Sequence, residues 1–138
     1  MNIQDFKGHI PEGDMLAEIF TAQRELMEKY HPIEEANGGG IMVDEIPVEI
    51  DDRRGQGRLK ELAWRVTEEI AEAMGCLKNR PWKSTPLATD REHFYEELAD
   101  ATHFFIELLI TAGIGPVELH DLYFRKNQVN QFRQRSNY

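Results

Sequence analysis

Apolar side chains recur at three- and four-residue steps along two long segments of the chain, which is the pattern of an amphipathic helix. The first segment spans residues 58–79, and its apolar stripe consists of Leu59, Leu62, Ala63, Val66, Ile70, Ala73, Met74 and Leu77. The second segment starts at the capping-box spacing of Thr89 and Glu92 and ends at Gly113. Its main stripe consists of Phe94, Leu98, Ala101, Phe105, Leu108 and Leu109. The pattern therefore predicts two helices that pack through these stripes.

Each of the two predicted helices carries a pair of carboxylates three residues apart at one side of its stripe. The first pair is Glu69 and Glu72, and the second is Glu97 and Asp100. At about 100° per residue, the two pairs lie at the same angles, roughly 60° and 120° from Val66 in the first stripe and from Phe94 in the second. Two helices packed through their stripes would therefore bring all four carboxylates to one shared edge.

Carboxylates gathered at a partly buried edge repel one another and lose hydration, so a cation is needed to keep them ionised. Oxygen ligands without Cys or His select Mg²⁺, with Mn²⁺ as a substitute, over zinc. The preceding residues Glu68 and Glu96 point farther towards solvent and are predicted to support the ligands. The alternative is a solvated acidic face, in which Arg65 pairs with Glu69 one turn further on.

Two further helices are predicted on either side of this pair. The first runs from about Asp14 to Tyr30 and closes at His31 and Pro32, and the last starts near Pro116. Between the first helix and the carboxylate helices, residues 32–57 break the pattern with glycine clusters, and we expect a short hairpin or a lid there. The whole chain is thus predicted to be all-α, a bundle of four or more helices with a long 32–57 connection.

Gln23 falls in the middle of the apolar face of the first helix. Burying an amide there costs about 1–3 kcal/mol unless it finds hydrogen-bond partners. One interpretation is that a neighbouring backbone group or a subunit contact satisfies it. The other is base recognition, because an amide offers both a donor and an acceptor to the edge of a pyrimidine or purine.

Cationic and aromatic residues suited to a nucleotide lie in two further places. Between the carboxylate helices, Trp82 is a candidate for stacking on a base and Lys83 for reaching a phosphate. Alternatively, Trp82 covers the end of the bundle and Lys83 faces solvent. In the last helix the candidates for a triphosphate clamp are Lys126, Asn127, Asn130 and Arg133. The alternative there is that cations near a helix C-terminus complement its dipole.

Charge and composition narrow the range of partners. A formal charge of −9 argues against a nucleic-acid polymer, which needs a basic surface, but is compatible with a small anion carried with its own metal. The 138 residues are expected to form one domain, 1–138. The single Cys76, the absence of a signal-peptide pattern and the lack of a long apolar run lead us to expect a cytoplasmic protein without a membrane partner.

The sequence motifs around the carboxylates resemble those of a known superfamily. "EEIAEAM", "RPWK" and "EELADATHFF", which cover about a third of the chain, are similar to the motifs of the all-α nucleoside triphosphate pyrophosphohydrolases, which include MazG-like proteins and dimeric dUTPases. "QREL" in the first helix and "RKNQVNQFRQRSNY" at the C-terminus resemble dimeric dUTPases in particular. Two positions depart from that pattern: Met27 lies where some relatives carry Asn, and Asn137 stands where the family usually has Gly.

The resemblance implies hydrolysis of a nucleoside triphosphate to the monophosphate and pyrophosphate, with dUTP as the first candidate. The departures leave room for dCTP or a purine nucleotide such as dGTP. It also implies that Glu69, Glu72, Glu97 and Asp100 hold on the order of two or three Mg²⁺ ions, and that the protein forms a homodimer or homotetramer. An alternative of another class is a non-catalytic helical module that binds a metal or a protein partner.

Overall fold

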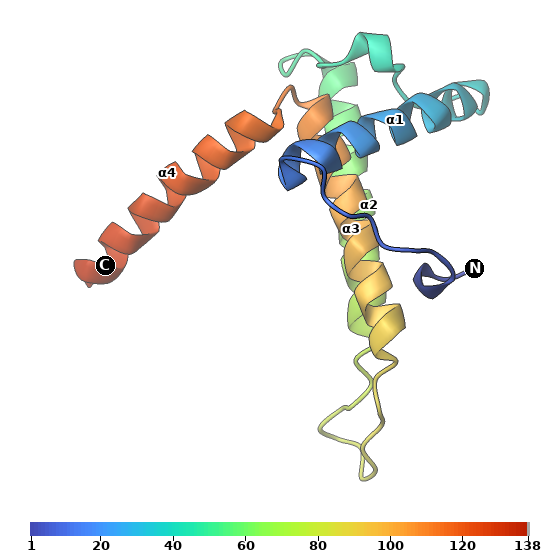
Figure 1. The fold of residues 1–138 in the computed structure, drawn as a ribbon, viewed down its shortest axis with the longest axis vertical. Helices are drawn as coiled ribbons and strands as arrows, with labels where there is room; N and C mark the ends of the chain where they lie inside the picture. The colour runs from blue at the N-terminus through green and yellow to red at the C-terminus, as the bar shows by residue number, and fades with distance from the viewer. Residues whose placement is uncertain (138) are drawn as a thin grey trace.

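The computed structural model describes residues 1–137, which form four α-helices and two short 3₁₀ helices, with no strand in that range (Figure 1). In chain order they are η1 (Ile3–Asp5), α1 (Met15–Ala36), η2 (Val43–Glu45), α2 (Arg53–Gly75), α3 (Arg91–Thr111) and α4 (Pro116–Arg135). The prediction of an all-α chain is confirmed.

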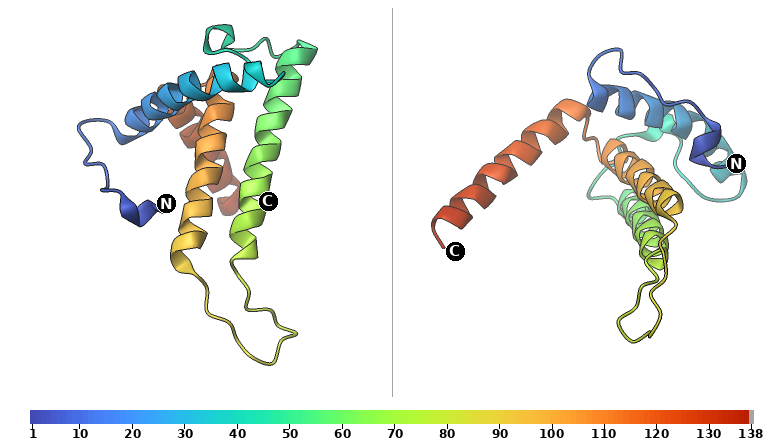
Figure 2. Two further views of the ribbon diagram at one scale, coloured as in Figure 1. Left: turned by 90° about the vertical axis from the view of Figure 1, so that its right-hand side faces the viewer. Right: turned by 60° about the horizontal axis from the view of Figure 1, so that its bottom comes forward.

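Helices α2 and α3 run antiparallel and side by side along most of their length, as Figures 1 and 2 show from several directions. Leu62 and Ala73 of α2 and Ala101 of α3 are almost fully buried. All three belong to the stripes that predicted this pairing, and burying such apolar surface contributes about 25 cal/mol per Å². Other members of the same stripes, Ile70, Met74, Leu77, Leu98 and Phe105, stay more than a third exposed. Only part of each predicted stripe therefore makes the contact that positions the carboxylates.

Both helices begin at an Asp cap, which differs from the predicted starts. Helix α2 starts at Arg53 and not at residue 58, because the Asp52 side chain accepts hydrogen bonds from the backbone N–H groups of Arg54 and Gly55. Gly55 is buried, and a Cβ there would collide with the carbonyl oxygen of Glu49. This glycine permits close packing and does not break the helix. In α3 the cap is Asp90, which accepts from the N–H of His93, and not Thr89.

Helix α1 does not close at Pro32 as predicted but continues to Ala36. A proline within a helix removes one backbone hydrogen bond, and here tertiary contacts on both sides of Pro32 hold the last turns in place. His31 is buried against Glu107 of α3, and Glu34 contacts Arg58 and Arg65 of α2. The remaining connection, 37–52, contains η2 and no strand, so the hairpin option is wrong for these residues.

The apolar core lies where α1 crosses the upper part of α3 (Figures 1 and 2). It consists of Phe20, Met27, Ile106, Leu109 and Ile110. The η2 segment packs against the same cluster, and the N–H of Val48 donates to the carbonyl of Thr111 at 2.9 Å. The core therefore fixes one end of the α2–α3 pair, and the other end extends away from it.

Helix α4 leaves the rest of the chain and has no buried residue. Gly113 makes the turn with a φ of 85°, Pro116 starts the helix as predicted, and α4 departs from α3 with a bend of 101°. Its contacts with the other helices are mainly with α1, so the four helices do not close into a bundle within one chain (Figure 1). No single described helix has the length and apolar composition to cross a membrane; α3 and α4 meet that test only together, across their bend.

Candidate metal-binding site

Three of the four predicted carboxylates meet on one side of the α2–α3 pair. Each of Glu69, Glu97 and Asp100 offers an oxygen, and these oxygens lie within 4.8 Å of one another. The fourth, Glu72, interacts with Glu97, and this interaction raises the pKa of Glu72. The equal angular offsets along the two stripes thus bring the pairs to a common edge, since antiparallel neighbours place equivalent offsets on the same side.

Glu97 is the most buried member of this carboxylate cluster, with 8% of its surface exposed. Its Oε1 lies 2.8 Å from His93 Nε2, one turn earlier in α3. When the neighbouring carboxyl groups are ionised, its Oε2 is buried without a hydrogen-bond partner among the described residues. A buried carboxylate oxygen that lacks a partner loses its hydration without compensation, so this atom points to a ligand that supplies positive charge.

Burial and mutual repulsion also shift the titration of the α2 pair. The pKa of Glu69 rises to about 7, first because of desolvation by burial, then because of the charge of Glu72 and a hydrogen bond with Glu97. The pKa of Glu72 is also raised, chiefly by its hydrogen bond and charge interaction with Glu97. Without a cation, the cluster therefore resists full ionisation near neutral pH.

The donor chemistry of the cluster fits a hard divalent cation. It offers several carboxylate oxygens from two rigid helices, and the nearest nitrogen ligand, His93, is engaged with Glu97. Oxygen-rich sets of this kind suit Mg²⁺ or Mn²⁺. Glu68 is exposed and its charge contributes to the raised pKa of Glu72, whereas Glu96 is half-buried. Both stay candidates for supporting roles.

Gln23 lies in a cavity of about 330 Å³ between α1 and α3. The side chain is buried, and its Oε1 lacks a hydrogen-bond partner among the described residues. The cavity is lined by Ile19, Ala22, Gln23, Leu26, Ala99, Thr102, His103 and Ile106. Ala99 lies directly before Asp100 in the α3 sequence and His103 lies three residues after it, but no carboxylate of the cluster lines the cavity.

Sequence reasoning did not identify His103 as part of this cavity. Its Nδ1 lies 2.8 Å from the carbonyl oxygen of Ala99, which makes Nδ1 the protonated nitrogen and Nε2 an acceptor in the neutral ring. Gln23 and His103 thus give a largely apolar cavity two polar groups from opposite helices. The sequence offered one indication of a role for His103, because it follows Asp100 by three residues and so lies on a neighbouring face of the same helix.

Trp82 and Lys83 lie in the loop of residues 76–90, which connects α2 to α3 beyond the end of the pair (Figure 1). Both are exposed, and Trp82 has 77% of its surface accessible. Trp82 therefore does not cover the end of the helices, contrary to one of the two interpretations. The loop begins directly after the helix that carries Glu72, so it neighbours the carboxylate cluster along the chain.

The predicted phosphate-binding residues of the last helix are not brought to the carboxylates. Lys126, Asn127, Asn130 and Arg133 all lie on α4, which projects away from the α2–α3 pair (Figures 1 and 2). Asn127 accepts a hydrogen bond from Gln131 at 2.7 Å, and Lys126 is exposed. Within one chain these residues do not form a clamp at the cluster.

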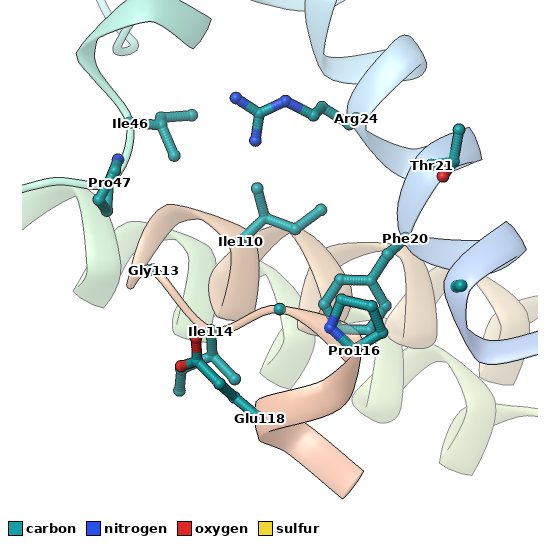
Figure 3. A pocket seen from close by; sticks show the side chains of 12 residues that line it. Phe20, Thr21, Arg24, Ile46, Pro47, Ile110, Gly113, Ile114, Pro116 and Glu118 are labelled. Carbon is teal, nitrogen blue, oxygen red and sulfur yellow. The ribbon is translucent and has the colours of Figure 1, made fainter.

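A second cavity, of about 480 Å³, lies at the junction of α1, residues 46–47 and the turn between α3 and α4. Figure 3 shows Phe20, Ile110 and Pro116 on its walls, with the guanidinium of Arg24 reaching over it. Ile110 lies ten residues from Asp100, which is about 15 Å along α3. This apolar cavity is therefore separate from the carboxylate cluster.

Comparison of the chain with models of known families, with curated proteins and with solved structures gives no significant match. The function is therefore inferred from the geometry of the cluster and the resemblance of its motifs.

Proposed function

We propose that the protein hydrolyses a (deoxy)nucleoside triphosphate to the monophosphate and pyrophosphate in a Mg²⁺-dependent reaction, with dUTP as the first candidate. The observation that carries this proposal is the meeting of Glu69, Glu97 and Asp100 around a buried, unpartnered oxygen of Glu97. The family resemblance of the motifs supplies the reaction type, and would place the α2–α3 pair in a MazG-like bundle.

The carboxylates of α2 and α3 would hold the metal. When bound, Mg²⁺ would neutralise charge on the phosphoryl oxygens and so favour attack at the phosphorus. The chain contributes a preformed, rigid arrangement: Glu97 is oriented by His93, and Glu69 and Glu72 are presented by the facing helix. Among these carboxylates, Glu69 is our choice for the group that accepts a proton from the attacking water.

The cavity between α1 and α3 is the candidate site for the base. Gln23 Oε1 would accept from an N–H of the base and its amide would donate to a carbonyl, while Nε2 of His103 offers a further acceptor. These groups match a pyrimidine edge such as uracil, and dCTP or a purine nucleotide such as dGTP is the alternative substrate. Trp82 and Lys83 would approach the nucleotide from the 76–90 loop.

A panel of nucleotides tests the reaction. We expect turnover with Mg²⁺ that yields monophosphate and pyrophosphate in equal amounts, with kcat/KM highest for one deoxynucleoside triphosphate. Release of orthophosphate would reject the mechanism. An absence of turnover with every nucleotide would favour the alternative, a non-catalytic module that binds a metal or a protein partner. That alternative predicts carboxylates that lie apart, which fits poorly with the observed cluster.

A matched pair of variants tests the residues. Asp100→Asn removes one exposed carboxylate of the cluster, and Glu92→Gln removes an exposed carboxylate from the first turn of the same helix. Substituting a residue that only hydrogen-bonds to a metal ligand typically lowers activity about 10–100-fold. Asp100 is a proposed ligand itself, so Asp100→Asn should lower kcat by at least about a hundredfold. Glu92→Gln should stay close to wild type. Full activity in Asp100→Asn would contradict the proposed site.

A further inference from the structure

The cavity beside Arg24 takes no part in the proposed reaction. It lies where α1 meets the turn between α3 and α4, has a volume of about 480 Å³, and is lined by none of the four cluster carboxylates. Cavities of about 300–1,000 Å³ that combine apolar walls with a few polar groups are typical of small-molecule sites. We call it the Arg24 cavity, and its apolar walls consist of Phe20, Ile46, Pro47, Ile110, Ile114 and Pro116 (Figure 3).

Small side chains on α1 leave the space that forms the Arg24 cavity. Ala17, Thr21 and Arg24 all line it, and their spacing of four and three residues puts them on one face of the helix. Phe20, which lies between them in the sequence, is 5% exposed and belongs to the core. The row therefore has room above its first two positions and a cation at its end.

Close backbone contacts hold the opposite walls in place. The N–H of Val48 donates to the carbonyl of Thr111 at 2.9 Å, which fixes the 46–47 segment against the end of α3. At Gly113, which has a φ of 85°, an added Cβ would lie 3.0 Å from Pro47 Cβ, so the turn approaches that segment closely. Pro47 and Gly113 both line the cavity. The cavity is therefore largely preformed, as ligand sites usually are.

The charge of Arg24 is not balanced within the chain. Arg54, Arg58 and Arg65 each pair with a carboxylate, whereas Arg24 forms no ion pair with any described residue. Glu28 follows Arg24 by four residues, which is the spacing of a helical ion pair, yet Figure 3 shows the guanidinium extended over the cavity. An anion in the cavity would supply the missing partner.

Glu118 is the one acidic side chain among the described residues that line the cavity. It lies in the first turn of α4, where the N-terminal end of the helix dipole offsets its charge. Figure 3 shows it on the opposite side of the cavity from Arg24. The Arg24 end of the cavity therefore stays positive, and the walls between the two charges are apolar.

We propose that the Arg24 cavity binds a small carboxylic acid with an apolar body, an alkyl or aromatic monocarboxylate. Its carboxylate pairs with the guanidinium of Arg24, which can form two parallel hydrogen bonds with such a group, and its body lies against Phe20, Ile110 and Pro116. Because Arg24 is the only cation among the described lining residues, a singly charged head group fits better than a phosphate dianion. The ligand would contact α1, the 46–47 segment and the start of α4 together.

Titration with octanoate tests this site. Octanoate combines a carboxylate with an alkyl chain, so we expect it to bind the wild-type protein with a dissociation constant below about 1 mM and to raise Tm. Octan-1-ol has the chain without the charge, and acetate has the charge without the chain, so each should bind at least about tenfold more weakly. A dissociation constant for octanoate above that limit, or equal affinity for octan-1-ol, would overturn the proposal.

Matched variants separate the charge of the cavity from its shape. Arg24→Gln should weaken octanoate binding at least about tenfold and leave octan-1-ol binding unchanged. Arg91→Gln is the control, because Arg91 is also an exposed helical arginine but does not line the cavity. Thr21→Trp fills the space above α1 and should weaken both ligands, and the exposure of Thr21 makes the change compatible with the fold. Wild-type affinity for octanoate in Arg24→Gln would contradict the pairing with Arg24.

Methyl NMR of the isoleucine side chains locates the ligand without a mutation. On addition of octanoate, the methyl signals of Ile110 and Ile114 should shift, because both side chains line the cavity, and those of Ile70 on α2 should not. Shifts confined to Ile19, which lines the cavity around Gln23, would place the ligand elsewhere and overturn the assignment.

This site is independent of the proposed reaction. Asp100→Asn should bind octanoate as wild type does, because Asp100 does not line the cavity. For the same reason, dUTP with Mg²⁺ should not displace octanoate, and displacement would mean that the cavity belongs to the nucleotide site and would overturn the proposal. A protein that turns over no nucleotide but still binds octanoate through Arg24 would count against the reaction and not against this site.

Discussion

At the scale of single residues, a few buried polar atoms lack the hydrogen bonds that would offset their loss of hydration. Glu97 Oε2 and Gln23 Oε1 are both buried without a hydrogen-bond partner among the described residues. Each such atom loses roughly 1–3 kcal/mol of stability relative to a satisfied one. Both adjoin the place where we propose that substrate and metal bind, which is where a ligand would recover that loss.

The cluster should make the metal-free protein less stable as pH rises. The folded-state pKa of Glu69, about 7, lies above its ordinary value of 4.5, so the folded state binds more protons than the unfolded state between these values. Stability should therefore fall from about pH 4.5 to pH 7. Thermal melts in EDTA across this range measure the trend.

Two controls separate the cluster from other titrating groups. Glu69→Gln should flatten the fall in Tm, because the glutamine is neutral throughout. Added Mg²⁺ should raise Tm more at pH 7 than at pH 5, since metal and protons compete for the same oxygens. A Tm that rises with pH in EDTA, and rises equally in Glu69→Gln, would contradict this account.

Gln23 should matter for recognition and not for stability. Gln23→Leu removes a buried unpartnered acceptor and keeps a side chain of similar size, so its Tm should equal or exceed that of wild type. Discrimination among bases should fall by at least about tenfold in kcat/KM, because a site that pairs with a polar edge loses that pairing. A marked loss of stability with unchanged selectivity would mean that Gln23 is a structural residue. The nucleotide panel described above gives kcat/KM for each base and therefore measures this selectivity.

At the scale of the helices, a buried ionic network joins α1, α2 and α3. Glu107 Oε1 lies 3.1 Å from His31 Nε2 and 3.3 Å from Arg58, and Arg58 also reaches Glu34 at 2.8 Å. Arg58 and His31 are almost completely buried. This network continues α1 past Pro32 and sets its crossing of α3, which in turn shapes the cavity around Gln23.

Removing one member of that network should be costly. Glu107→Ala removes the buried carboxylate that Arg58 and His31 share and leaves Arg58 with the more exposed Glu34 and Glu61. Loss of one partner of a buried pair costs up to about 3–5 kcal/mol in the free energy of unfolding. Urea denaturation measures it. Arg54→Ala breaks the exposed pair with Glu45 and is the control, with an expected cost below about 1 kcal/mol. Equal effects of the two variants would mean that the network does not hold α1.

At the scale of the whole molecule, one chain does not bury its own apolar surface. The core occupies the crossing of α1 and α3, whereas the far end of the α2–α3 pair and all of α4 extend into solvent (Figure 2). Leucine and phenylalanine side chains on these arms stay exposed, which disfavours an isolated monomer. Association is the simplest way to bury them.

Sedimentation at micromolar concentration should therefore give at least twice the chain mass of 16.0 kDa. Leu98→Asp together with Phe105→Asp places charges on the exposed apolar face of α3 and should shift the protein to the monomer. Phe6→Asp, a substitution in the exposed N-terminal segment, should leave the mass unchanged. A wild type that stays at 16.0 kDa would contradict the association of these faces.

The sequence by itself determined the helices and the side on which the carboxylates lie. The stripes of α2 and α3 fix which faces pack, and the offset of Glu69, Glu72, Glu97 and Asp100 from those stripes follows from helical geometry. Both are local properties, since they depend on residues within a few turns of one another. The cap at Asp52 was not predicted because Gly55 and Gly57 suggested that the helix had not yet begun. The cap at Asp90 was not predicted because the neighbouring Thr89 has capping-box spacing.

Only the tertiary structure decided where α1 ends, which residues share the cavity with Gln23, and where α4 points. Pro32 and its neighbours favour a helix end locally, but His31 and Glu34 find partners on α2 and α3 that outweigh the lost backbone bond. The direction of α4 depends on a single turn at Gly113, where no pattern of apolar spacing specifies an angle. These features depend on contacts between residues far apart in the chain. The apolar periodicity of a single helix does not predict such contacts.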